Sequence, residues 1–446
     1  MANSSKKKTK VSASKKGGTK RAGSAPPTSG ASAGAPTGFR VRTYQVGFGD
    51  CLLLTFEYPS TKKHVLIDFG SVRLPKNAPN NQMMLIAQDI AKVCGSEGLT
   101  AVVETHRHRD HISGFSTDKK NDPGKIIAGL KPKLVLHPWT EDPNAKTDAQ
   151  TATGSGGYAK AFVGRLDAMQ AFSGAAYTEF QQLQARKCLG LAAELGFAGE
   201  NNLPNDSAVR NLMTMAPEKN HEYLNCGMKT TLPSLLPGVK VWVLGPPTLK
   251  QSQAITKESS VNKDEFWQLQ KSTSNFARSQ HFSAGSEWTK NLPESSRWFR
   301  RRADKLRADQ MLGLVRILDK AMNNTSVILL FEVGGKRFLF PGDAQWENWS
   351  YALSRPELKA LLTNIELYKV GHHGSRNATP KTMWTAVKGG GTNLNTIVST
   401  LTGVFGNEKV KTEVPRSTLI SELEKNSKFY TTEGQTALAG EVAFSF

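Results

Sequence analysis

Short apolar segments alternate with polar turns along the first hundred residues of the chain, and they predict a sheet followed by a helix. Residues 39–46, 51–58 and 63–70 have the length and composition of strands and are separated by turns that contain glycine or proline. Residues 81–93 carry apolar side chains at helical spacing, and residues 99–105 form another buried strand. Strands that alternate with helices predict an α/β layered fold.

The second half of the chain returns to strand-like segments. Residues 239–247 read as one strand, and residues 325–344 as a pair of strands that turns at Gly334 and Gly335. We expect each half to contribute one sheet. Two polar, helix-rich segments, at about 145–235 and 250–322, interrupt the pattern, and we interpret them as insertions. The second directly precedes the strand pair, so we hypothesise that it forms a lid.

The amino-terminal segment differs in composition from the rest. Residues 1–37 contain seven lysines, one arginine and no acidic residue, among many Ser, Gly, Ala and Pro. Such a segment cannot bury a core, so we expect a disordered basic tail at 1–38 and a folded domain at 39–446. The tail carries +8 of the net charge of +20. The remainder is still basic and compatible with a polyanionic partner, although a merely solubilising charge is the alternative.

The apolar segments are too short to cross a membrane. None approaches the roughly 18 to 20 residues that a span requires, and the amino terminus lacks the apolar stretch of a secretion signal. The four cysteines are widely separated, which indicates reduced thiols and not a disulfide framework. We therefore expect a cytoplasmic protein without membrane insertion.

The stretch THRHRDHISGF concentrates metal-binding side chains directly after a predicted strand. Three of the nine histidines of the chain and one aspartate fall within six residues, as His106, His108, Asp110 and His111. Zinc and similar ions favour imidazole and carboxylate ligands, and a catalytic site keeps one coordination position open for water. We predict a metal site here; a solvated surface cluster is the alternative.

Two further apolar segments end in ligand-type residues. Asp343 follows the strand in LFPGDA, and His372 and His373 follow the strand in LYKVGHHGSRN. Because ligands of α/β folds usually lie at strand ends, these residues are candidates to complete the site.

The chain resembles the metallo-β-lactamase superfamily and, within it, the ComEC-type competence hydrolases. The matching segments are VGFGDCLLL, LIDFG, THRHRDHISG, NNTSVILLFEVGGKRFLFPGD and YKVGHHGS, in the order of that family and across about residues 44–375. The resemblance implies a four-layer αββα sandwich with helical insertions. It also implies two divalent metal ions, zinc or manganese, at one edge of the two sheets.

The resemblance assigns roles to individual residues. The first metal would bind His106 and His108, the second would bind Asp110, His111 and His373, and Asp343 would bridge both. Of the HHGS pair, His373 is the preferred ligand, which leaves His372 as a substrate-facing or proton-transfer group; the reverse order stays open. Asp110 is the other candidate for proton transfer.

Other residues near the motifs have candidate supporting roles. The resemblance assigns Asp68 to hydrogen bonding of the histidine loop, with a turn former as the alternative. His137 is a candidate additional ligand of the first metal, although an ordinary histidine at a strand end fits as well. Lys369, Ser375 and Asn377 could contact phosphate oxygens or could be purely structural.

The expected function is that of a metal-dependent phosphodiesterase or nuclease. Water activated between two cations would attack phosphorus, and the metal charge would offset the negative charge that develops. Arg297, Arg300, Arg301 and Arg302 could bind nucleic acid together with the aromatic residues between them, or could lie on a helix that packs inward. Alternatives are a hydrolase of small esters or small phosphodiesters, a component that acts only with a protein partner, and a catalytically silent metal-binding scaffold.

Overall fold

The computed structural model describes residues 34–142, 205–256, 264–266, 321–389, 393–406, 408 and 412–446. The predicted tail at 1–38 lies almost wholly outside the described residues, as do most of the two predicted insertions and the arginines at 297–302. Most of the predicted lid at 250–322 lies outside them as well.

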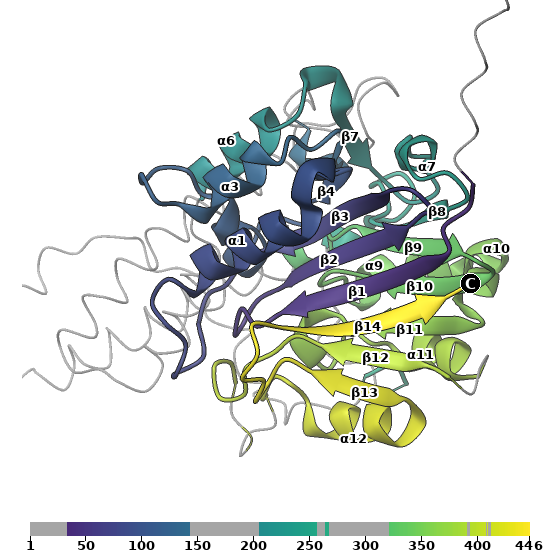
Figure 1. Ribbon diagram of the computed structural model, residues 1–446. Coiled ribbons are helices and arrows are strands. Elements are labelled where there is room, and N and C mark those ends of the chain that lie inside the picture. Colours follow the sequence, from purple (N-terminus) through teal and green to yellow (C-terminus); the bar gives the residue numbers. More distant parts are fainter. Residues whose placement is uncertain are drawn as a thin grey trace, which may run out of the picture. The chain divides into compact units, whose positions relative to one another are not determined.

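Two mixed sheets form the body of the fold (Figure 1). The first sheet has the strand order β14 (Ala439–Ser445), β1 (Gly38–Tyr44), β2 (Cys51–Glu57), β3 (Lys62–Phe69), β4 (Ala101–Val103), β5 (Val135–Pro138) and β7 (His221–Leu224). The second has the order β13 (Lys428–Thr431), β12 (Asn395–Val398), β11 (Ile365–Lys369), β10 (Lys336–Phe340), β9 (Ile328–Val333) and β8 (Lys240–Gly245). The mixed α/β class predicted from the sequence is confirmed.

Each sheet joins an antiparallel part to a parallel part. In the first, β14, β1, β2 and β3 are antiparallel and β3, β4, β5 and β7 are parallel. In the second, β8, β9 and β10 are antiparallel and β10 to β13 are parallel. The carboxyl-terminal strand β14 pairs with β1, so the first sheet draws on both ends of the folded part and not on one half of the chain.

The helices of the described residues connect the strands. They are α1 (Gln82–Cys94), α2 (Arg109–Ile112), α3 (Pro123–Gly129), α6 (Asp206–Thr214), α7 (Leu232–Leu235), α9 (Trp346–Ser354), α10 (Pro356–Lys359), α11 (Lys381–Lys388) and α12 (Ser417–Asn426). The strand β7 and the helices α6 and α7 come from the last part of the segment expected as the first insertion. None of these helices is long and apolar enough to cross a membrane.

The core explains why the strands read as nearly continuous apolar runs. Alternate residues of β2, such as Leu54, belong to a cluster that includes Phe331 and Phe338 of the second sheet. The rings of Phe39 and Phe338 lie 4.3 Å apart, so side chains of the two sheets are in contact. The intervening residues of β2, such as Leu53, pack instead with α1. Burial on both faces removes the usual polar alternation.

Candidate metal site

The candidate ligands lie where strands of both sheets end. His106 and His108 follow β4, and the short helix α2 carries Asp110 and His111. From the second sheet, Asp343 follows β10, and a 3-10 helix at His372–Gly374 follows β11. Three of the five segments that the resemblance rests on are therefore brought to one place from both halves of the chain.

Two glycines allow the chain to pack tightly against α2. A Cβ on Gly70 would lie 2.4 Å from the backbone nitrogen of His111, and a Cβ on Gly49 would lie 2.7 Å from the carbonyl oxygen of Asp110. Both distances are well below contact, so no other residue fits without moving the helix. This is a physical reason for glycine in the VGFGD and LIDFG segments, and it fixes the backbone of two candidate ligands.

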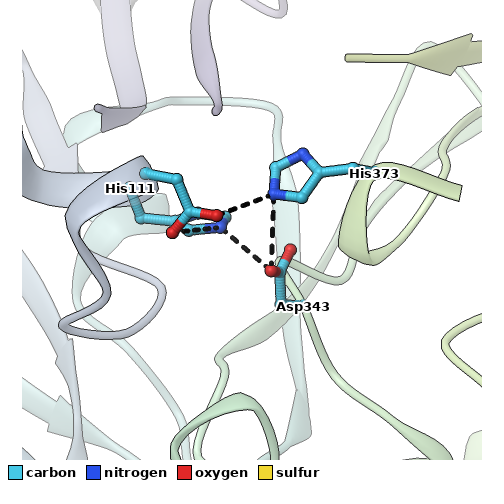
Figure 2. A group of neighbouring side chains, drawn as sticks. His111, Asp343 and His373 are labelled. Carbon is cyan, nitrogen blue, oxygen red and sulfur yellow. Dashed lines mark hydrogen bonds and ion pairs between the residues drawn. The ribbon is translucent and has the colours of Figure 1, made fainter. Parts of the chain in front are cut away.

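Histidine side chains converge on the carboxylate of Asp343 (Figure 2). The Nε2 atoms of His111, His373, His372 and His106 lie 3.1, 3.6, 3.8 and 4.0 Å from Asp343 Oδ2. Neither oxygen of Asp343 accepts a hydrogen bond from the described residues, although the side chain is only 1% exposed. A buried carboxylate with such surroundings requires a cation or protons on the histidines.

Asp110 completes a group of four buried ligands. One ligand atom each of Asp110, His111, Asp343 and His373 lies within 4.8 Å of the others. His373 Nε2 is 3.1 Å from Asp110 Oδ2. Imidazole nitrogens and carboxylate oxygens are suitable ligands for zinc and manganese. The four side chains therefore fit a divalent metal ion.

Asp68 holds the loop that carries His106 and His111 through hydrogen bonds on the side away from Asp343. Its carboxylate accepts hydrogen bonds from Thr105 N at 2.8 Å, from Thr105 Oγ1 at 2.7 Å and from His111 Nδ1 at 2.7 Å. Because Thr105 Oγ1 donates its hydrogen to Asp68, it can accept one from His106 Nδ1, which is 3.2 Å away. Both imidazoles then carry hydrogen on Nδ1 and present the lone pair of Nε2 toward Asp343, as metal ligands must.

The HHGS pair has an unusual backbone. His372 and His373 have φ angles of 47° and 52°, in the left-handed region that residues other than glycine seldom occupy. His373 Nδ1 donates to the carbonyl oxygen of Ser399 at 3.0 Å, which leaves its Nε2 lone pair directed at Asp110 and Asp343. Such strain is typical of functional sites, because surrounding contacts must hold it in place.

The charges of this cluster depend on one another. Burial lowers the pKa of His111 and of His373, but the neighbouring carboxylates, Asp343 first, outweigh burial and raise both pKa values. Burial likewise opposes ionisation of Asp343, yet the adjacent histidines, His111 first, hold its pKa well below the usual range. Burial and then His111 and His108 lower the pKa of His106. The cluster is arranged to hold positive charge.

Asp50, in the VGFGD segment, was not predicted to belong to the site. Asp50 forms a second group of potential ligands with Asp68 and His111. Its carboxylate forms a buried ion pair with the ammonium group of Lys369. Burial lowers the pKa of Lys369, but Asp50 and then Asp343 outweigh it and raise the pKa. Lys369 therefore neutralises part of the carboxylate charge, and its contact with a substrate stays a prediction.

The remaining predicted residues are placed in different surroundings. His108 Nδ1 lies 2.9 Å from His106 Nε2, beside the cluster. His137 is buried on β5, where Nδ1 contacts Glu104 and Nε2 lies 3.1 Å from His221 Nδ1. Ser375 and Asn377 follow the HHGS histidines and are also buried.

A scan against models of protein families found no match for this chain, and a search of curated proteins found none either.

Proposed function

We propose that the chain is a phosphodiesterase that depends on two divalent cations, zinc or manganese, and that nucleic acid is its substrate. We also propose that the two sheets and their helices form the four-layer αββα sandwich of the metallo-β-lactamase superfamily, of the ComEC type. The observation that carries the proposal is the approach of four histidine Nε2 atoms to the buried Asp343 carboxylate.

In this proposal the residues would divide between two ion positions, and Asp343 would contribute to both. Asp110, His111 and His373 would hold one ion together with Asp343, and His106 and His108 would hold the other. Two bound cations would supply an activated water and would neutralise charge on phosphate oxygens. The chain itself holds the imidazoles in the tautomer that binds metal, through the hydrogen bonds of Asp68 and Ser399.

The substrate class follows from charge and from access. The chain carries a net charge of +20, which favours association with a polyanion. His372 is 20% exposed, whereas His111, His373 and Asp343 are at most 1% exposed, so a phosphodiester would reach the cluster beside His372. Arg297 and Arg300 to Arg302 lie outside the described residues, so their part in binding nucleic acid stays a prediction.

Hydrolysis of bis(p-nitrophenyl) phosphate by the full chain, with added zinc or manganese, tests the activity directly. Asp110→Ala and Asp343→Ala should abolish turnover and reduce the metal content. Asp118→Ala is a matched control, because Asp118 is an exposed carboxylate that contacts only Arg210 among the ion pairs of the described residues. Absence of turnover with either metal on this ester, DNA and RNA would contradict the proposal.

Binding of single- and double-stranded DNA as a function of salt tests the substrate class. Phosphate contacts release counterions, so the affinity should fall steeply as salt rises. A flat salt dependence together with turnover of the small ester would indicate a hydrolase of small phosphodiesters instead.

A further inference from the structure

Two adjacent histidines contact the same carboxylate but have different partners on their other ring nitrogen. His373 Nδ1 lies 3.0 Å from the carbonyl oxygen of Ser399, which can only accept a hydrogen bond. His372 Nδ1 lies 3.4 Å from Nε2 of Gln345, an amide nitrogen, which can only donate. The neutral ring of His373 therefore carries its hydrogen on Nδ1, and that of His372 carries it on Nε2.

A chain of buried side chains agrees with this direction of the Gln345 amide. Asn377 Nδ2 donates to Gln345 Oε1 at 3.0 Å, and Ser375 Oγ donates to Asn377 Oδ1 at 2.9 Å. Gln345, Asn377 and Ser375 are 2%, 5% and 7% exposed, so water does not readily replace these bonds. Turning the Gln345 amide alone would place its Nε2 against Nδ2 of Asn377, two donors without an acceptor.

The position of His372 suits a donor better than a ligand. Its Nε2 lies 3.8 Å from Asp343 Oδ2, and it is the one HHGS histidine with solvent access, at 20% exposure. A metal ligand needs the lone pair of Nε2, which the hydrogen occupies in this tautomer. An Nε2–H group at the edge of the cluster can instead donate to an oxygen of a bound ester.

We propose that Gln345 is a positioning residue that holds the hydrogen of His372 on Nε2, so that His372 donates a hydrogen bond to the leaving-group oxygen and does not bind metal. The hydrogen stays on His372, and the bond stabilises negative charge as the phosphorus–oxygen bond breaks. The part that concerns the ester rests on the proposed function, whereas the tautomer does not. Gln345 follows Asp343 by two residues, at the start of α9.

Nitrogen-15 NMR of the full chain, labelled at histidine and loaded with zinc, tests the tautomer directly. The spectrum of His372→Asn identifies the signals of His372. At a pH where the ring is neutral, we expect His372 to carry hydrogen on Nε2 and His373 to carry it on Nδ1. Hydrogen on Nδ1 of His372, or a metal-bound Nε2, would overturn the inference, and this measurement needs no variant of Gln345 to fold.

Gln345→Glu is the sharpest variant, because it preserves shape and replaces the donor by an acceptor. The carboxylate should move the hydrogen of His372 to Nδ1, while the signals of His373, backed by Ser399, stay unchanged. Gln345→Met, which lacks a strong donor or acceptor, should let both tautomers appear. An unchanged His372 spectrum in both variants would show that Gln345 does not control the tautomer.

Kinetics separate this inference from the proposed function. Loss of one donor to the developing charge should lower kcat of Gln345→Glu by about a hundredfold on esters with an alkoxide leaving group. The loss should be smaller with p-nitrophenolate, which needs less stabilisation, and KM should change little. Equal losses on both esters would contradict donation to the leaving group. If no diester is turned over, the proposed function fails while the NMR result still decides the tautomer.

Discussion

Two groups of histidines and carboxylates lie near the same end of the first sheet, and they are organised in opposite ways. In the Asp343 cluster, which comprises His106, Asp110, His111, Asp343 and His373, nitrogen lone pairs converge on one carboxylate. In the Glu104 chain, which comprises Glu104, His137 and His221, each side chain contacts the next in a line. The line ends where His221 Nε2 lies 3.2 Å from the carbonyl oxygen of Ala216.

The difference shows what makes a histidine available to a metal. In the Asp343 cluster, buried acceptors such as Asp68 and Ser399 take up Nδ1, and Nε2 faces side chains that are themselves candidate ligands. In the Glu104 chain both nitrogens of His137 have partners. The two groups share the same residue types, so the arrangement of hydrogen-bond partners, and not composition, separates a candidate ligand from a structural side chain.

Substitution of the shared carboxylate should produce the largest contrast between the two groups. Asp343→Ala removes the residue that both ion positions use, so we expect loss of metal and a fall in kcat/KM of about a thousandfold or more. Glu104→Gln removes a buried charge from the other group and should keep the metal content. Metal analysis after gel filtration checks both; loss of metal in Glu104→Gln would break the comparison.

The strands and the histidine motif could be predicted from sequence because their signals are local. Buried apolar runs identify β2, β3 and β4, and the spacing from His106 to His111 identifies the loop that follows β4. Asp343 could also be predicted, since it directly follows an apolar strand.

The hydrogen-bond and ion-pair partners of the candidate ligands could not be predicted, because they come from distant parts of the chain. Ser399 follows β12, Gln345 directly precedes α9 and Asp50 precedes β2, and no local pattern links them to the histidines. For His137, the sequence does not show on which face of strand β5 the side chain lies. It lies two residues after Val135, whose side chain packs with α1, so the pleat directs both to the helix side.

Substitution of an outer partner should have an intermediate effect. Asp68→Asn keeps the shape but weakens acceptance from His111 Nδ1, so we expect a loss of about 10- to 100-fold in metal affinity. Competition with a chromophoric chelator measures this. Asp89→Asn is the matched control, since Asp89 lies on α1 and accepts hydrogen bonds from Tyr44 and Arg42 of β1. Equal affinities of the two variants would argue against a role of Asp68 in binding.

The stabilisation of the protein by zinc should depend on pH, because protons and metal compete for the histidines of the Asp343 cluster. Despite burial, the neighbouring carboxylates raise the pKa of His111 and of His373 above the ordinary 6.5. Their contribution to stability is therefore complete below pH 6.5 and is lost as the pH rises through the raised values. Metal binding requires the neutral rings and is therefore favoured as the pH rises. The increase in Tm caused by zinc should thus grow as the pH rises above 6.5 and through the raised pKa values.

Thermal unfolding with zinc and with a chelator across this range measures that increase. Asp343→Ala removes the carboxylate that contributes most to both raised pKa values, so in this variant the difference between the two curves should vanish. A zinc-dependent increase that stays constant with pH would show that protons and metal do not compete for these histidines.

The smallest effect on metal is expected for His137, the candidate additional ligand. His137→Asn should leave the metal content and affinity unchanged, because both ring nitrogens already have partners in the Glu104 chain. It should lower the free energy of unfolding by about 3 to 5 kcal/mol, since Glu104 would remain buried without its partner. The double variant Glu104→Gln with His137→Asn should recover part of that loss, because no charge is then left unpaired. If His137→Asn instead loses one metal per chain at unchanged stability, His137 is a ligand of the first ion and the Glu104 chain must open when metal binds.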